Sequence, residues 1–83
     1  MSITYTVDKF YDEDGDKVVG LLCTDADGNA FITDKRIKLI DGTSNESYVK
    51  QAYDASKAAI DKWAAQFDVK GKTFDPTDGS LSS

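Results

Sequence analysis

Three Asp-Gly pairs constrain the fold of this chain more than any other feature. They are Asp14-Gly15, Asp27-Gly28 and Asp41-Gly42. Asp-Gly between apolar segments is a strong hairpin signal, because both residues tolerate a positive φ. The pairs therefore divide the first half of the chain into three expected strands, over residues 3–11, 17–24 and 30–40, joined as an antiparallel β-meander.

The register of these strands can be tested against their alternation. If the first two Asp-Gly loops contain two residues each, Tyr11 opposes Val18 and Leu22 lies between Val7 and Thr33. Side chains alternate between the faces of a sheet, so this register fixes which residues point inward. The expected inward face comprises Ile3, Tyr5, Val7, Tyr11, Val18, Leu22, Phe31, Ile37 and Leu39. A bulge is expected beside Gly20, which falls on this face between two lysines.

The segment after the third Asp-Gly pair predicts one long amphipathic helix, over about residues 44–68. Thr43 as N-cap with Glu46 fits a capping box, and Ser44 is a competing cap. Its apolar stripe comprises Val49, Tyr53, Ser56, Ile60, Trp63, Ala64 and Phe67. A stripe of this width predicts that the helix packs on one face of the sheet.

The remaining residues, 69–83, form a C-terminal tail with a turn around Pro76. A short fourth strand over residues 72–74 is compatible with the pattern, and Phe74 is expected to tuck back onto the core. The last residues are expected to fray. The predicted fold class is therefore α+β, a three-stranded antiparallel β-meander packed on one long C-terminal amphipathic helix, in a single domain spanning residues 1–83.

Composition argues against an enzyme. The chain has no histidine, which removes the commonest acid–base residue and metal ligand. The lone Cys23 has no histidine to activate it and is expected to be a structural apolar residue. No glycine-rich phosphate loop is present, so no cofactor is expected. The sequence therefore predicts a protein without catalytic residues.

The acidic turns resemble calcium loops only superficially. An EF-hand loop needs oxygen ligands at its first, third and fifth positions, glycine at the sixth and glutamate at the twelfth. Alignment on Gly15 puts Phe10 first and Leu21 twelfth, and alignment on Gly28 puts Cys23 first. Successive turns of a meander also lie at opposite ends of the sheet. No metal site is expected.

A protein interface is expected on the sheet face away from the helix. The assumed registers bring Phe10, Val19, Leu21 and Ile32 together on that face, inside a charged rim. An apolar centre with a charged rim is typical of protein interfaces. The alternative is that the C-terminal tail covers part of this face.

A second candidate surface is the first acidic turn, formed by Asp12, Glu13, Asp14 and Asp16. With a formal net charge of −5, the chain is not expected to bind nucleic acid or an anionic membrane directly. An acidic surface can instead imitate nucleic acid in the groove of a basic protein. The one basic cluster, residues 35–38, is interpreted as protection of an edge strand.

The whole chain resembles the small acidic accessory proteins of tailed bacteriophages. It is short, acidic and cysteine-poor, and its tail, residues 71–79, is similar to endings of such proteins. The resemblance carries over no functional residue. It implies either a virion component, such as a capsid-decorating or tail-associated protein, or an early inhibitor of a host defence enzyme.

The leading hypothesis is a non-enzymatic protein-interaction module that binds itself, as a homo-oligomer, or docks on a larger complex, with a role as a phage virion accessory protein. The alternative is a phage-encoded inhibitor of a host nucleic-acid-binding defence enzyme that acts by nucleic-acid mimicry. The sequence contains no run of 18 apolar residues and no signal-peptide pattern at its start. The expected location is the cytoplasm, including that of an infected host cell, or a virion.

Overall fold

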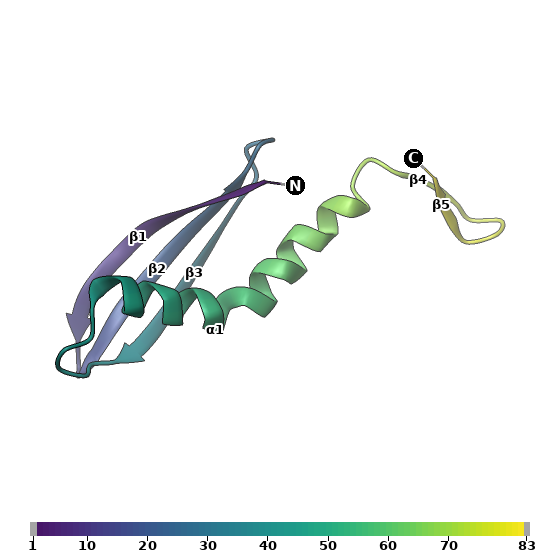
Figure 1. The fold of residues 1–83 in the computed structure, drawn as a ribbon. Coiled ribbons are helices and arrows are strands. Elements are labelled where there is room, and N and C mark those ends of the chain that lie inside the picture. Colours follow the sequence, from purple (N-terminus) through teal and green to yellow (C-terminus); the bar gives the residue numbers. More distant parts are fainter. Residues whose placement is uncertain (1, 83) are drawn as a thin grey trace.

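The computed structural model describes residues 2–82, which form a sheet, a long helix and a separate C-terminal hairpin (Figure 1). The sheet has the order β1 (Ile3–Glu13), β2 (Asp16–Asp25) and β3 (Ala30–Lys38), all antiparallel. The helix α1 (Asn45–Ala65) continues into a 3-10 turn, η1 (Gln66–Asp68). The hairpin pairs β4 (Thr73–Asp75) with β5 (Ser80–Ser82). The predicted α+β class, a three-stranded meander with one C-terminal helix, is confirmed.

The first hairpin has the two-residue loop that its Asp-Gly pair predicts. Glu13 pairs with Asp16, and Asp14 and Gly15 both have a positive φ, of 52° and 82°. The expected bulge beside Gly20 is also present, since the register of β1 shifts between Val7 and Lys9. The bulge moves Val7 from its expected partner Leu22 to Leu21. Every residue of β1 before the bulge therefore has a partner one position away from the predicted one.

The second hairpin has a three-residue loop, and the prediction of a two-residue loop is wrong. The Asp25 carboxylate accepts hydrogen bonds from the backbone N–H groups of Asp27 and Asn29, both at 2.9 Å. The Asp25 N–H donates to the Asn29 carbonyl, and Gly28 takes a φ of 86°. This is a type I turn closed by a left-handed glycine, which is the common three-residue solution. These hydrogen bonds, led by those from Asn29, also lower the pKa of Asp25.

The longer loop shifts β3 by one residue, so Leu21 pairs with Thr33 and Leu22 with Ile32. A shift of one residue reverses the faces of a strand relative to its neighbour. The helix consequently covers the face that carries Val19, Leu21 and Cys23. The predicted inward positions Tyr11, Val18 and Leu22 lie on the opposite face. That part of the inward-face prediction is wrong.

The N-cap of the helix is Ser44, the competing candidate, rather than Thr43. The Thr43 N–H donates to the Ile40 carbonyl at 3.2 Å, which places Thr43 in the preceding turn. The Ser44 hydroxyl instead accepts from the Ser47 N–H. The buried residues of the helix recur every three or four positions along one face. They are Tyr48, Ala52, Ser56, Ile60 and Trp63. The prediction of an amphipathic helix lying on the sheet is confirmed.

Aromatic stacking fixes the distal half of the helix on the sheet. The ring of Trp63 stacks on Phe31 of β3, with 5.6 Å between centroids, and meets Phe67 edge-on at 5.5 Å. Ile60 is 1% exposed and packs with Leu21 and Cys23 in the same cluster. The core thus runs from Tyr48 near the start of the helix to Trp63 near its end. We call the three strands and α1 the body.

The last part of the chain lies outside this core. Every residue from 68 to 82 is exposed, and Figure 1 shows the β4–β5 hairpin beyond the end of the helix, away from the sheet. The radius of gyration is 17.1 Å and the longest dimension 59 Å. A compact chain of this length has a radius of gyration of about 12 Å. We call residues 69–82 the arm, and its projection makes the molecule elongated.

Candidate protein-docking site

The interface predicted from the sequence is not formed in the folded chain. Val19 and Leu21 lie beneath the helix, 0% and 2% exposed, and Phe10 is half-buried against the same core. Ile32 is 57% exposed but lies on the opposite face of the sheet. Phe10 keeps its predicted partner Val19, and the three-residue loop alone separates Ile32 from the other three. The prediction that these four residues share one open face is wrong.

The sheet face opposite the helix carries ion pairs across its strands. The Lys9 Nζ contacts the Asp34 carboxylate at 3.1 Å, and the two side chains meet over Gly20. A β-carbon at Gly20 would lie 2.7 Å from Asp34 Oδ1 and 3.0 Å from Lys9 Cβ. Glycine is therefore required for this cross-strand pair to close. Leu22 and Ile32 form the apolar pair beside it.

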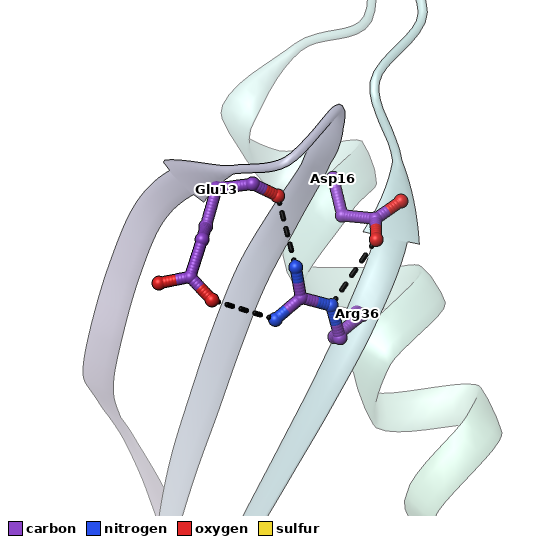
Figure 2. Close-up of polar contacts among 3 residues, drawn as sticks. All are labelled: Glu13, Asp16 and Arg36. Carbon is purple, nitrogen blue, oxygen red and sulfur yellow. Dashed lines mark hydrogen bonds and ion pairs between the residues drawn. The ribbon is translucent and has the colours of Figure 1, made fainter.

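Two cations of the same chain pair with carboxylates of the acidic turn. Arg36 of β3 contacts Glu13 Oε1 at 3.0 Å and Asp16 Oδ2 at 3.1 Å, and it also donates to the Glu13 carbonyl (Figure 2). These two carboxylates raise the pKa of Arg36, with Glu13 the larger cause. Lys17 forms an ion pair with Asp12. Among the four residues of the candidate mimic surface, only Asp14 has no such partner in the described chain.

Intrachain pairing weakens the acidic turn as an imitation of nucleic acid. A mimic surface must present uncompensated negative charge to a basic groove. Here two cations lie within contact distance of three of the four carboxylates. The planar Arg36 guanidinium, held by both strands of the first hairpin and by β3, stabilises the turn itself. The geometry therefore favours a structural role for these residues.

An apolar groove lies on the helix side of the sheet, between β1 and the first turns of α1. Its volume is about 440 Å³, and its walls are Tyr5 and Leu21 from the sheet with Val49 and Tyr53 from the helix. Asn45, Glu46 and Lys50 form its polar rim. The Tyr5 and Tyr53 rings meet edge-on, with 5.1 Å between centroids. The pKa of Tyr5 is raised to about 12, mainly by partial desolvation and secondly by the neighbouring Tyr53 side chain.

The groove exists because the helix does not cover the whole sheet. The core clusters include Ile3 and Phe10 of β1, whereas Tyr5 and Val7 between them remain 41% and 46% exposed on the helix side. Exposed apolar side chains around a concave surface are typical of docking sites. The groove is therefore the first candidate for binding a partner.

The arm is the second candidate. Phe74 and Leu81 are direct cross-strand partners, and they are 59% and 48% exposed. Its turn is well defined, because Gly79 donates to the Asp75 carbonyl at 2.8 Å and Asp75 Oδ1 accepts from Thr77. The prediction that Phe74 tucks back onto the core is wrong. The arm instead presents an apolar pair on a short projecting hairpin.

The described residues offer little else that carries chemistry. No group of three or more potential metal-ligating side chains gathers anywhere in residues 2–82. Cys23 is fully buried among the residues of the core, and burial raises the pKa of its thiol. No helix in the described part of the chain is long and apolar enough to cross a membrane.

Comparison with known proteins gives no relative from which function could be transferred. No family model matches the chain, and neither a curated protein nor a solved structure matches it. The function is therefore inferred from the side chains and surfaces of this chain alone.

Sequence reasoning missed both the groove and the free arm. A signal for the arm was present: residues 73–75 and 80–82 alternate polar and apolar side chains on either side of an Asp-Gly turn. The short fourth strand predicted at residues 72–74 corresponds to β4. Its partner β5 was missed, because the last residues were expected to fray. No local signal marks the groove, because its walls come from three elements.

Proposed function

We propose that this chain is a non-enzymatic protein-interaction module whose arm docks on another protein. The observation that carries the proposal is the exposed Phe74–Leu81 pair on a hairpin that lies apart from the body. An isolated two-stranded hairpin is only marginally stable in water. Burial of both side chains by a partner would stabilise the hairpin and the complex together.

The energetic case rests on the size of these two side chains. Full burial of a Leu or Phe side chain contributes roughly 1.5–3 kcal/mol. Two such anchors, together with backbone hydrogen bonds from a strand edge, are comparable to the small apolar centres that dominate many interfaces. The arm buries no apolar anchor against its own body, since residues 68–82 are all exposed. Docking is thus the role that best accounts for an apolar pair in this position.

The biological setting remains the one implied by the resemblance of the sequence. In a virion accessory protein, the arm would join the acidic body to another copy of the chain or to a capsid or tail protein. The mimicry alternative gains no support from the acidic turn, because Arg36 and Lys17 pair with three of its four carboxylates.

Site-specific photo-crosslinking in the cells that produce the protein tests the proposal. A photoreactive residue replaces Phe74 in one sample and Ile32 in a control, since the two side chains are exposed to a similar extent, 59% and 57%. We expect a defined adduct from position 74 and none from position 32. The crosslinked protein is then identified by mass, purified and titrated with the wild type and with Phe74→Ser/Leu81→Ser.

The expected result is binding that the double substitution abolishes while the circular dichroism of the body is unchanged. Binding that the double substitution leaves intact, or the absence of any adduct at position 74, would contradict the proposal.

A further inference from the structure

We infer that the partner of the arm is a second copy of this chain, and that Phe74 and Leu81 of one copy enter the groove of the other. The inference rests on the proposed function and names the partner of the same arm. The groove is the one lined by Tyr5, Leu21, Val49 and Tyr53. Each copy therefore carries both halves of one contact.

The groove and the arm match in size and character. The walls of the groove are apolar, and its volume of about 440 Å³ lies in the range of roughly 300–1,000 Å³ that is typical of ligand pockets. The arm presents one aromatic and one aliphatic side chain, side by side on paired strands. The aromatic walls Tyr5 and Tyr53 offer edges and faces against which Phe74 can pack.

The arm cannot fill the groove of its own chain. From Val49, at the far wall, to the end of η1 the helix rises about 24 Å and the 3-10 turn about 6 Å, at ~1.5 and ~2.0 Å per residue. A fully extended chain from Asp68 to Phe74 spans at most about 22 Å, so contact with the far wall is out of reach of Phe74. Leu81 reaches no farther than Phe74, because the two residues are cross-strand partners. While the helix and the β4–β5 hairpin are folded, an arm that fills the whole groove therefore comes from another copy.

Charge at the two surfaces is complementary. Glu46 lies at the rim of the groove, and Lys72 directly precedes the first strand of the arm. Within residues 2–82 neither of them has an ion-pair partner, whereas the second rim charge, Lys50, pairs with Asp54 at 2.8 Å. The arm also carries Asp75 and Asp78, whose carboxylates accept hydrogen bonds from the Thr77 and Ser80 N–H groups of its own turn. The Glu46 carboxylate and the Lys72 ammonium therefore remain to pair between copies.

A two-fold axis would satisfy both contacts at once. If the arm of the first copy enters the groove of the second, the axis places the second arm in the first groove. This reciprocal exchange closes the assembly at two chains and buries four apolar anchors. It corresponds to a dimer with twice the 9.1 kDa mass of the chain.

Sedimentation equilibrium of the full-length chain tests the inference, over roughly 1–100 μM, where a Kd near micromolar is resolved. We expect a monomer–dimer equilibrium for the wild type and a monomer throughout for Phe74→Ser. The matched control is Ile32→Ser, an equally exposed apolar residue outside both surfaces, and it should leave the Kd unchanged.

Charge reversal adds a test that does not depend on lost apolar area. Glu46→Lys and Lys72→Glu should each raise the Kd about fivefold, as expected for a partly exposed pair, and the double variant should recover most of that loss. A wild type that is monomeric at every concentration overturns the inference, and so does a dimer that Phe74→Ser leaves intact.

The outcome also separates this inference from the proposed function. A monomeric wild type whose position 74 still crosslinks a different protein refutes self-association and leaves the docking role standing. A monomer with no adduct at position 74 refutes both.

Discussion

Two of the antiparallel hairpins differ in their surroundings: β1–β2 lies in the body, and β4–β5 forms the arm. Both have an Asp-Gly pair in the turn, Asp14-Gly15 in the first and Asp78-Gly79 in the second. In the first, Val19 and Leu21 are almost completely buried; in the second, Phe74 and Leu81 are about half exposed. The difference is the helix, which covers one hairpin and carries the other away from the core. Local sequence thus suffices to form a hairpin, and packing against the helix determines whether its apolar side chains are buried in their own chain.

The largest contrast should come from one substitution made in both hairpins. Leu21→Asp places a charge without a partner at a position 2% exposed, so we expect the body to unfold, a loss of about 4 kcal/mol or more. Leu81→Asp makes the same chemical change in the arm and should alter stability by less than about 0.5 kcal/mol. Urea unfolding followed by circular dichroism measures both. Equal losses at the two positions would show that the arm packs on the body.

A smaller effect is expected at Gly20, beneath the Lys9–Asp34 pair. The added β-carbon of Gly20→Ala would lie 3.0 Å from Lys9 Cβ, a backbone-anchored atom that cannot rotate away. We expect a loss of about 1–3 kcal/mol, as for other overpacked sites. In an Asp34→Ala background the loss should shrink, because the nearest atom, Asp34 Oδ1, is gone. An unchanged urea midpoint for Gly20→Ala would contradict the close cross-strand packing.

The body should also accept a stabilising change. The Ser56 hydroxyl is fully buried and has no hydrogen-bond partner within the described residues. Ser56→Ala removes this desolvated group and improves helix propensity, so we expect a gain of about 0.5–1.5 kcal/mol in the free energy of unfolding. Thr33→Val, at the other buried hydroxyl without a partner, should act in the same direction. A loss of stability in both variants would indicate that buried water satisfies these hydroxyls.

The two hairpins of the sheet also show how far sequence reasoning extends. The Asp14-Gly15 loop and the bulge beside Gly20 follow from local chemistry, and both are present. The Asp27-Gly28 pair carries the same signal but closes a three-residue loop, because Asp25 and Asn29 bond to each other across the turn. That one extra residue reversed the predicted faces. Sheet faces depend on every loop before them, so one local error changes the whole candidate interface.

Other features depended on contacts that sequence spacing does not contain. The sequence offered Thr43 and Ser44 as N-caps, and Ser44 caps the helix because Thr43 lies in the preceding turn. Tyr48 was outside the predicted stripe, yet it is buried against Val19 and Ala52, and its hydroxyl bonds to the backbone of Ile40. The groove and the free arm are tertiary features of the same kind. The strands, the helix and the first Asp-Gly turn were therefore predictable, whereas the length of the second loop, the sheet faces and the groove were not.

Amide hydrogen exchange in dilute solution tests most directly whether the arm is separate from the body. We expect the amides of β2 to exchange only through global unfolding, and those of β4 and β5 to exchange with little protection, because no part of the arm is buried. Raising the protein concentration should protect the arm as copies associate. Arm amides as strongly protected as those of β2 in the dilute monomer would contradict the account, because they would place the arm in the core of its own chain.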